Sequence, residues 1–218
     1  MKPIVPFFSV IITTYNRSAL LIRALNSLIS QTESDWEAII IDDGSKDDTA
    51  DSVSAFLNPG KMTYVWQMPQ GAAQAKNHGI YLSKGKYITF LDSDDEYYPC
   101  HLQTRKWILE TNPGAGFLHG GMKVIGSEYV PDRWNYDKMI HLKDCSVGGT
   151  FFIKRELCLA LGGFADIPFG HDADFFDRIN TSEIIKIKTS EPTYIYHRET
   201  SNSITNHFAA YNNSSCFL

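Results

Sequence analysis

Apolar and polar residues follow one another along the first half of the chain in blocks that alternate between a strand-like and a helix-like pattern. Runs rich in apolar and β-branched residues occur at 8–14 (FSVIITT), 36–43 (WEAIIIDD), 62–67 (MTYVWQ) and 86–95 (KYITFLDSDD). Runs of this length, bounded by polar residues, are typical of buried strands in a parallel sheet. The pattern therefore predicts four strands within the first 95 residues.

Segments with helical periodicity separate these strands. In residues 18–31 we expect Ser18 to be the N-cap of a helix. Its expected apolar face consists of Leu21, Leu25, Leu28 and Ile29. A turn and a second helix are expected in residues 44–57, where acidic residues suit a helix N-terminus.

Two further helices complete the first half. The segment 71–85 predicts a helix that Gly85 closes, and Pro99 opens another helix through residue 110. Strands that alternate with helices at this spacing form parallel βαβ units. The predicted fold class is therefore α/β, a doubly wound and mostly parallel sheet with helices on both faces.

The alternation loosens beyond about residue 113. Short strands and one short helix are expected in residues 114–126 and 148–164, and a helix in residues 171–179. Further strands are expected near residues 184–189 and 193–198, before a tail, 206–218, that has no clear pattern. Because the chain contains no internal repeat, low-complexity segment or linker, we predict a single domain over residues 1–218 with two functional halves.

Composition excludes several classes of protein. The formal charge of −5 over 218 residues argues against a nucleic-acid-binding protein, which usually has a basic stripe. No apolar run approaches the roughly 20 residues of a transmembrane helix. The cysteines form no C-x-x-C pair, so we interpret them as reduced thiols of a cytoplasmic protein. They are Cys100, Cys145, Cys158 and Cys216.

Three of the predicted strands end in polar clusters. These clusters are TTYN at 13–16, DDGS at 42–45 and DSDD at 92–95. Ligands of an open parallel sheet bind beyond the carboxyl ends of its strands, so the three clusters are expected at one rim. Each cluster alone is compatible with a capped turn between a strand and a helix. Together they indicate a binding site.

The third cluster favours a divalent cation. Four acidic residues lie between positions 92 and 96, and Asp92 and Asp94 form an Asp-x-Asp pair. Hard oxygen ligands suit Mg²⁺ or Mn²⁺, which commonly recruit substrate phosphates to complete their shell. The chain has neither G-x-G-x-x-G nor G-x-x-x-x-G-K-[ST]. In haloacid-dehalogenase-type phosphatases Thr or Val stands where this chain has Asp95, and a response-regulator receiver leaves the Asp-x-Asp without a role.

The ordered set of motifs resembles family 2 inverting glycosyltransferases of the GT-A fold, which build bacterial polysaccharides. The similar stretches are SVIITTYNR, LNSLISQTESDWEAIIIDDGSKDDT, AQAKNHGIYLSKGKYITFLDSDDEYYP, GGTFFIKRELCLALGGF and GHDADFFDR. They occur in the family's order over roughly residues 8–180. The resemblance implies a nucleotide-sugar-binding half at about 8–112 and an acceptor half at about 113–205.

The resemblance also implies roles for individual residues. The nucleotide-binding residues would be Thr13, Tyr15, Asp43, Lys76, Asn77, Asp92 and Ser93. Tyr15 would flank the base, and Asp43 would accept a hydrogen bond from its ring N–H, which favours UDP or dTDP. Asp94 would bind the metal directly, with Asp92 nearer the ribose or a metal-bound water. Lys76 replaces the Arg that is commoner in the family.

Inverting transfer also needs a base that takes the proton of the acceptor hydroxyl. The family's base matches Asp172 in GHDADFF, with Asp174 as the rival candidate and His171 where Glu is common. The family often has a His-containing loop after its last strand that contacts the metal or the diphosphate. His197 or Arg198 would take that place here, and both residues are equally compatible with a surface or core position.

The predicted protein is thus a glycosyltransferase that uses Mn²⁺ or Mg²⁺, a UDP- or dTDP-sugar, and a saccharide or lipid-linked saccharide acceptor. Two alternatives stay open. A sugar nucleotidyltransferase would have a Gly-rich basic loop after the first strand, which TTYNRS lacks, and a silent nucleotide-binding module would not need Asp92, Asp94 and Asp172 together. We expect a cytoplasmic location and leave association with the inner face of the membrane open.

Overall fold

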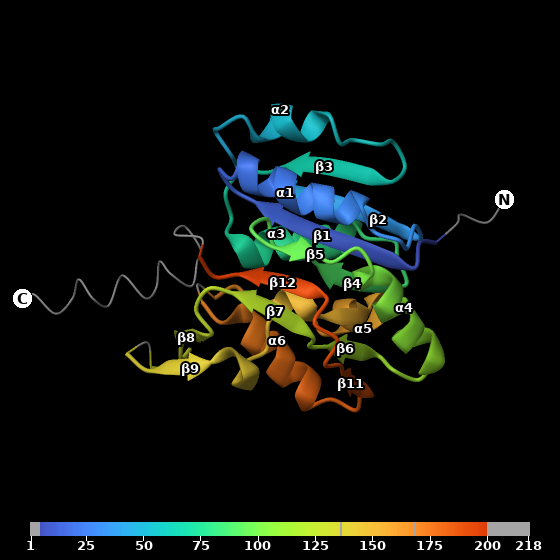
Figure 1. The fold of residues 1–218 in the computed structure, drawn as a ribbon, viewed down its shortest axis with the longest axis vertical. Helices are drawn as coiled ribbons and strands as arrows, with labels where there is room; N and C mark the ends of the chain where they lie inside the picture. The colour runs from blue at the N-terminus through green and yellow to red at the C-terminus, as the bar shows by residue number, and fades with distance from the viewer. Residues whose placement is uncertain (1–4, 136, 168, 200–218) are drawn as a thin grey trace, which may run out of the picture.

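The computed structural model describes residues 5–135, 137–167 and 169–199. Its central sheet has seven strands in the order β11-β6-β10-β4-β1-β2-β3 (Figure 1). These strands are β1 (Phe8–Thr14), β2 (Trp36–Asp42), β3 (Met62–Trp66), β4 (Tyr87–Phe90), β6 (Phe117–His119), β10 (Phe152–Lys154) and β11 (Lys186–Lys188). The pairs β4–β1, β1–β2 and β2–β3 are parallel, whereas β10 is antiparallel to both β4 and β6. The mostly parallel sheet is as predicted.

Side-chain alternation along β1 explains why helices cover both faces of the sheet. Phe8, Val10 and Ile12 point to one face, while Ile11 points to the other, and all four are buried. A strand that is apolar on both faces needs a helical layer on each side. β1 is therefore the centre of the fold.

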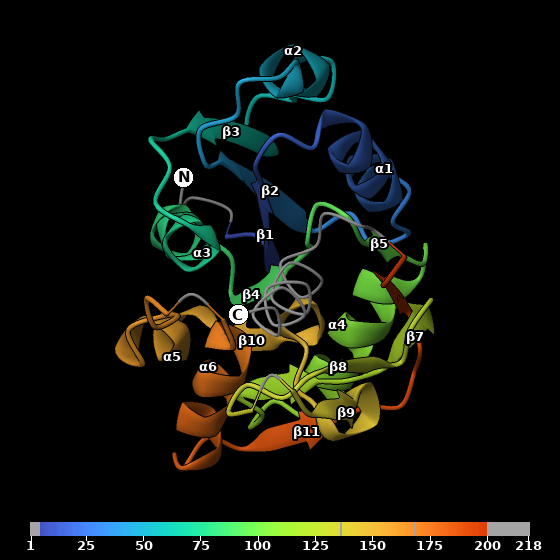
Figure 2. The ribbon, with the colours of Figure 1, turned by 90° about the vertical axis from the view of Figure 1, so that its left-hand side faces the viewer.

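The helices form these two layers, as Figure 2 shows from the side. The helices α1 (Ser18–Ile29) and α4 (His101–Thr111) pack on the face of Phe8, and α2 (Thr49–Ser54) joins the same cluster through Val53. The opposite face is covered by α3 (Ala72–Leu82), α5 (Arg155–Ala160) and α6 (His171–Asn180). This arrangement confirms the predicted α/β fold class.

The second half of the chain adds two small sheets. A three-stranded sheet has the order β5-β12-β7, and a two-stranded hairpin pairs β8 with β9. Their bounds are β5 (Glu96–Tyr97), β7 (Met122–Ile125), β8 (Tyr129–Pro131), β9 (Met139–His141) and β12 (Tyr194–His197). Gly120 and Gly121, with φ of 89° and 73°, let the chain leave β6 and enter β7 in a different sheet. Two 3₁₀ turns, η1 (Leu142–Asp144) and η2 (Gly148–Thr150), follow the hairpin.

Three expectations about helix ends and faces are wrong. Ser18 is the first helical residue of α1, Arg17 precedes it, and no side chain caps this end. Ile29 is 51% exposed, because Ala24 rather than Ile29 completes the buried face of α1. Helix α3 ends at Leu82, and Gly85 lies beyond it, where a Cβ would come within 2.5 Å of the Ser9 backbone nitrogen. Gly85 thus permits close packing on β1.

The fourth strand is shorter than predicted. β4 ends at Phe90, and residues 92–95 form a turn in which the Asp95 amide donates to the Asp92 carbonyl oxygen at 2.9 Å. The chain then enters β5 in the second sheet. The Asp-x-Asp pair consequently lies on a turn at the carboxyl end of β4, where the side chains of Asp92 and Asp94 can line the same cavity.

Two smaller expectations can also be compared with the structure. Cys100, Cys145 and Cys158 are free thiols, and Cys216 lies outside the described residues, as does the expected tail at 206–218. Within the described part of the chain, no helix is both long enough and apolar enough to cross a bilayer.

Candidate active site

A cavity of about 880 Å³ opens at the carboxyl ends of β1, β2 and β4. Both halves of the chain line it. Six of the seven predicted nucleotide-binding residues, all from the first half, lie in its wall. The predicted residues in its wall are Thr13, Tyr15, Asp43, Lys76, Asp92, Ser93, Asp94 and Asp172. Residues up to 159 positions apart in the sequence, from Thr13 to Asp172, therefore meet at one rim, as expected for a doubly wound sheet.

Asn77 is the predicted nucleotide-binding residue that is not in this wall. Its amide nitrogen donates to the Phe164 carbonyl oxygen at 2.9 Å, and its amide oxygen accepts from the Phe164 nitrogen at 2.8 Å. Gly163 makes room for this contact, because a Cβ there would meet the Asn77 side chain. Asn77 joins α3 to the segment after α5, and the structure does not bring it to the cavity.

The loops after β1 and β2 hold each other in place. Asn16 has a left-handed backbone, with φ of 51°, which asparagine tolerates better than most residues. Its side-chain oxygen accepts from the Lys46 amide at 2.7 Å, and its own amide donates to the Ser45 hydroxyl at 2.8 Å. Tyr15, half exposed beside this turn, and the partly buried Thr13 thereby take fixed positions in the cavity wall.

Asp43 is held by three donors. One carboxylate oxygen accepts from the Gln67 side chain at 2.7 Å and from the Gln70 amide at 2.8 Å, and the other accepts from the Gly71 amide at 2.7 Å. The side chain is 8% exposed and lines the cavity. A carboxylate has about four acceptor positions, so the second oxygen can accept another hydrogen bond from a ligand.

Two arginines approach Asp94. The Arg17 guanidinium lies 3.1 Å from a carboxylate oxygen of Asp94, while Arg23 from α1 donates to its main-chain carbonyl oxygen. Arg23 also lies 3.4 Å from the Glu96 carboxylate. Burial raises the pKa of Asp94, and nearby Asp92 raises it further, against the opposing effect of Arg17. The ionised form of Asp94 therefore depends on a positive charge beside it, which Arg17 supplies in this structure.

Lys76 bridges the two halves of the site. Its ammonium nitrogen lies 3.3 Å from a carboxylate oxygen of Asp92 and 3.4 Å from one of Asp172. The residue is 4% exposed. Burial opposes the charged form, but the two carboxylates outweigh burial and raise the pKa of Lys76 above its usual range. One buried cation thus links the Asp-x-Asp turn to α6.

Asp172 lies in the first turn of α6 and faces this cation. The Gly148 amide donates to its carboxylate at 3.1 Å, and the His171 ring nitrogen lies 3.3 Å from it. Burial alone would raise the pKa of Asp172, yet the charge of Lys76 and the hydrogen bond from the Gly148 amide help to lower it. Because burial lowers the pKa of His171, its ring is neutral at pH 7 and Lys76 is the cation that matters. Asp172 is accordingly an ionised acceptor at neutral pH.

Asp174, the rival candidate, has a different environment. Its carboxylate lies 2.9 Å from Arg178 one helical turn away, and it is not among the described residues that line the cavity. The geometry therefore favours Asp172 as the carboxylate that can reach a bound molecule.

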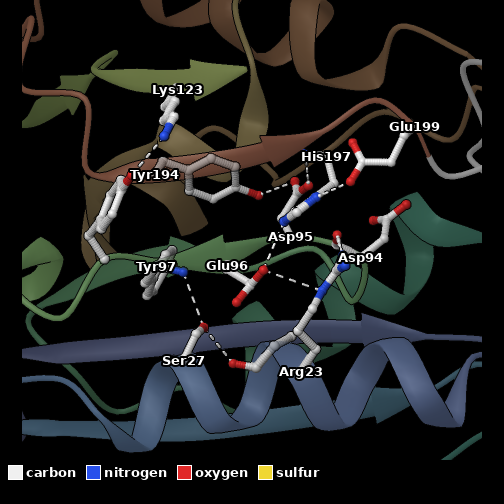
Figure 3. A network of polar contacts seen from close by, with 12 residues as sticks. Arg23, Ser27, Asp94, Asp95, Glu96, Tyr97, Lys123, Tyr194, His197 and Glu199 are labelled. Carbon is white, nitrogen blue, oxygen red and sulfur yellow. Dashed lines mark hydrogen bonds and ion pairs between the residues drawn. The ribbon is translucent and has the colours of Figure 1, made fainter. Parts of the chain in front are cut away.

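A buried carboxylate fixes the turn from behind. Asp95 is fully buried and accepts hydrogen bonds from the Tyr194 hydroxyl at 2.5 Å and the His197 amide at 2.8 Å (Figure 3). Burial, together with the charges of Asp94 and Asp92, raises the pKa of Asp95 well above its usual range. These contacts attach the Asp-x-Asp turn to β12, which lies far along the chain.

His197 and Arg198 do not offer a free ligand in this arrangement. One ring nitrogen of His197 lies 2.8 Å from Glu96 and the other 2.7 Å from Glu199, as Figure 3 shows. Arg198 is buried, stacks over the Tyr196 ring at 5.8 Å, and is not among the described residues of the cavity wall. His197 lines the cavity, but both of its nitrogens are engaged by carboxylates.

The hairpin β8–β9 forms part of the opposite wall. Arg133 in its loop pairs with Asp177 of α6 and stacks over Trp134, with 4.7 Å between the guanidinium carbon and the ring centre. The Asp132 carboxylate accepts from the Trp134 amide at 2.7 Å, which fixes the backbone there. The Trp134 side chain is nevertheless 83% exposed at the cavity wall.

The residues present fit a hard divalent cation that a substrate helps to bind. Asp92 and Asp94 supply two carboxylates at one turn, and both line the cavity. Over residues 5–135, 137–167 and 169–199, no group of three or more His, Cys, Asp or Glu side chains could enclose a metal by itself. Mg²⁺ and Mn²⁺ commonly use one or two carboxylates together with substrate phosphates and waters, so the donor set fits them.

A family model described as "Glycosyl transferase family 2" matches residues 9–149 of this chain. The chain belongs to glycosyl transferase family 2. This result confirms the family that the motifs resemble. The matched region contains β1 to β4 and the Asp-x-Asp turn, and it ends just before the strand that carries the chain back into the sheet.

Among curated family 2 relatives, two are informative. The chain is 29% identical over 175 residues to the Escherichia coli UDP-Glc:alpha-D-GlcNAc-diphosphoundecaprenol beta-1,3-glucosyltransferase WfgD. The matched region covers 77% of this chain and 66% of that protein. The chain is 38% identical over 127 residues to an uncharacterized Nostoc glycosyltransferase, covering 57% of this chain and 39% of that one. The chain thus spans less than two thirds of the length of these relatives.

Solved structures of transferases share the fold of this family 2 chain. S. aureus TarS 1–349 in complex with UDP-GlcNAc superposes with a TM-score of 0.76 at 20% identity, over 90% of this chain and 60% of that 1–349 chain. The Pyrobaculum calidifontis mannosyltransferase PcManGT in complex with GDP-Man and Mn²⁺ gives a TM-score of 0.71 at 20% identity, over 87% and 56%. These matches confirm the predicted GT-A fold.

Sequence reasoning missed several residues of the site. Arg17 lies within the quoted TTYNR motif, but nothing in the sequence indicates that it meets Asp94. Nothing in the sequence indicates that Gly148 approaches the proposed base, yet a Cβ there would lie 2.5 Å from the Asp172 carboxylate. The loop of the β8–β9 hairpin has no periodic signal, so Arg133 and Trp134 could not be assigned to the cavity from sequence.

Proposed function

We propose that this protein is a metal-dependent inverting glycosyltransferase that moves a sugar from a nucleoside-diphosphate sugar to an acceptor hydroxyl. The observation that carries the proposal is the Lys76 bridge. Its ammonium group contacts both the Asp92 carboxylate of the Asp-x-Asp turn and the Asp172 carboxylate, so both carboxylates lie next to one cation. A donor bound at the turn would thus have its reacting carbon near a base.

The nucleotide is proposed to bind at the ends of β1 and β2. Asp43 has one carboxylate oxygen with room for a further donor, and uracil or thymine offers its N3–H. Cytosine has an unprotonated acceptor at that position, so it would face a carboxylate with no proton between them. We therefore propose a preference for UDP- or dTDP-sugars. Thr14 also lines the cavity, and its buried hydroxyl has no hydrogen-bond partner among the described residues.

Asp94 and Asp92 are proposed to hold Mn²⁺ or Mg²⁺. When bound, such an ion stabilises negative charge on the departing diphosphate. PcManGT, whose structure contains Mn²⁺ with GDP-Man, supports this choice by its shared fold. Two residues keep the turn in position. The Asp95 carboxylate accepts a hydrogen bond from the His197 amide, and Arg23 donates to the Asp94 carbonyl oxygen.

Asp172 is proposed to be the general base. Its carboxylate is ionised at neutral pH and 25% exposed, so it can accept the proton of an acceptor hydroxyl as that oxygen attacks the anomeric carbon. Lys76, bridging to Asp92, orients the carboxylate. Because the attacking oxygen and the diphosphate lie on opposite sides of the carbon, the transfer inverts its configuration.

The acceptor is proposed to be a saccharide, free or lipid-linked, in the synthesis of a cell-surface polysaccharide. The family membership and WfgD, whose name describes an acceptor on diphosphoundecaprenol, support this class of acceptor. Trp134, exposed at the cavity wall, offers a flat apolar surface on that side.

Calorimetric titration tests the donor assignment. UDP and dTDP should bind in the presence of Mn²⁺, CDP should bind more weakly, and Asp94→Ala should lose most of the Mn²⁺-dependent part of the affinity. Asp174→Asn, outside the cavity wall, is the matched carboxylate control and should bind UDP like the wild type. Equal affinities for CDP and UDP would contradict the role of Asp43, and an Asp94→Ala variant with unchanged affinity would contradict the metal site.

A further inference from the structure

Arg17 occupies the carboxylate that the metal would need. It is the residue immediately before α1, and its guanidinium lies 3.1 Å from an Asp94 oxygen. The two side chains are 19% and 12% exposed, and both line the cavity. An arginine so close to a proposed metal ligand forms a charge-assisted contact with one oxygen of that carboxylate and offsets the negative charge that would attract the ion.

Arg23 has a different position at the same turn. It donates to the main-chain oxygen of Asp94 and lies 3.4 Å from Glu96, so it holds the backbone of the turn (Figure 3). The turn can therefore keep its shape whether or not Arg17 stays on the Asp94 carboxylate. This separation allows Arg17 to change partners without loss of the turn.

A divalent ion at Asp94 would compete with Arg17 for the same carboxylate and would also repel its positive charge. A diphosphate entering the cavity provides anionic oxygens, which a guanidinium binds well through its planar set of donors. Arg17 would lose one anionic partner and gain another when the metal and the nucleotide arrive together.

We propose that Arg17 is a clasp that holds the Asp94 carboxylate in the free protein and transfers to the diphosphate when the metal–nucleotide pair binds. This inference rests on the proposed function, since it needs both ligands. Metal alone must displace the clasp without offering it a new partner, so it binds weakly. Nucleotide supplies that partner and strengthens metal binding. Linkage requires the metal to strengthen nucleotide binding by the same factor.

The experiment measures Mn²⁺ affinity by the electron paramagnetic resonance signal of free Mn²⁺, on the full chain, with and without UDP. Removing the clasp in Arg17→Ala should tighten Mn²⁺ binding without UDP by roughly fivefold or more, and should reduce the factor by which UDP strengthens Mn²⁺ binding. Arg17→Gln removes the charge but keeps a hydrogen-bond donor, and it should shift both values in the same direction.

Lys86→Ala is the matched control. It also removes one positive charge, but Lys86 is exposed just before β4, at the end of the strand opposite to the Asp-x-Asp turn. Its Mn²⁺ affinities should equal those of the wild type. Thermal melting shows whether each variant is folded, and Arg17→Gln replaces Arg17→Ala in the comparison if the alanine variant does not fold.

Each result has a separate meaning. Mn²⁺ affinity that is unchanged or weaker in the folded Arg17 variants without UDP overturns the clasp and leaves the proposed function intact. A wild-type protein that binds no Mn²⁺ even with UDP overturns the metal-dependent function, and the clasp with it. A gain that Lys86→Ala shares would show a general effect of net charge and would also overturn the clasp.

Discussion

The two sides of the cavity are built in different ways. On the side of residues 8–112, polar side chains follow the ends of the parallel strands β1, β2 and β4, and backbone amides or a partly buried cation hold them, as for Asp43 and Asp94. On the side of residues 113–199, the strands have three or four residues, and a hairpin, two 3₁₀ turns and a helix end form the wall.

This difference teaches where the precision of the site originates. The strands β1, β2 and β4 each have a paired neighbour on both sides, so their ends are rigid positions for the proposed nucleotide. Asp172 belongs to the second side, yet Lys76 from α3 of the first side holds its carboxylate. The proposed base is thus held from both sides, by Lys76 of the first and by the Gly148 amide of the second. Three predictions test this comparison.

The largest expected effect comes from the proposed base. Asp172→Asn keeps the size and hydrogen-bonding reach of the side chain but cannot accept the hydroxyl proton. General-base catalysis contributes about 10²–10⁴-fold, so turnover should fall by that factor. UDP affinity should change little, because Asp172 faces the acceptor side. Hydrolysis of UDP- and dTDP-sugars, followed as release of the nucleotide, measures the loss with water as the acceptor.

Asp174→Asn is the matched control on the same helix. Its partly exposed pair with Arg178 is worth about 0.3–0.5 kcal/mol of stability, and the turnover should remain close to that of the wild type. If Asp174→Asn abolishes hydrolysis while Asp172→Asn remains active, the roles of the two carboxylates are reversed.

The second prediction removes the bridge between the two sides. Lys76→Met leaves the carboxylates of Asp92 and Asp172 without their shared cation. These carboxylates are 28% and 25% exposed, so the expected loss is about 3 kcal/mol, the low end for breaking a buried ion pair. Urea denaturation at pH 7 gives the free energy of unfolding. Lys76→Arg keeps the charge and should lose less.

The cost of Lys76→Met should depend on pH. The folded-state pKa of Asp172 is lowered in the wild type, so this group contributes stability above its unfolded pKa of about 3.9, and that stability disappears as the pH falls through the folded pKa. Without Lys76, burial raises the pKa of Asp172 instead. The difference between the two proteins should therefore be full at pH 7 and narrow below about pH 4. A difference that stays constant between these values would show that Lys76 does not control the charge of Asp172.

The third prediction concerns the fit of the base against the second side. A Cβ at Gly148 would lie 2.5 Å from the Asp172 carboxylate, so Gly148→Ala must displace this side chain. A displacement of about 1 Å can cost about 10²-fold in rate, and we expect turnover to fall by up to that factor while UDP affinity is kept. Donor hydrolysis and calorimetry measure the two quantities.

A double variant separates displacement from general damage. If Gly148→Ala acts through Asp172, adding it to Asp172→Asn should lower turnover little further, because contacting residues are not additive. A full second loss in the double variant would mean that Gly148 acts independently of the base.

The sequence predicted the first side of the fold better than the second for a physical reason. β1 and β2 are continuous runs of apolar and β-branched residues, and α1 has a clear apolar stripe, so local pattern alone indicates them. The strands β8, β9 and β11 have three residues each, too few for periodicity to be visible. The predicted fourth strand extended past the end of β4, because residues 92–95 directly follow an apolar run that has the pattern of a strand.

The site shows the same limit. Strand ends and family motifs indicated eight residues of the cavity wall, but not which of their side chains touch. Asn77 occupies a family position for nucleotide binding, yet it pairs with the Phe164 backbone, a contact 87 residues away that no local pattern reveals. The Arg17–Asp94 pair joins residues 77 positions apart, and it likewise depends on the folded arrangement.

The position of β10 has a consequence for synthesis on the ribosome. This strand pairs with β4 on one side and β6 on the other, so β4 is an open edge until residues 152–154 have been made. Chains fold from the N-terminus as they emerge, and an unpaired edge strand recruits other chains. The nascent protein should therefore be most prone to aggregate, and most dependent on chaperones, during the interval in which β1 to β4 have emerged and β10 has not.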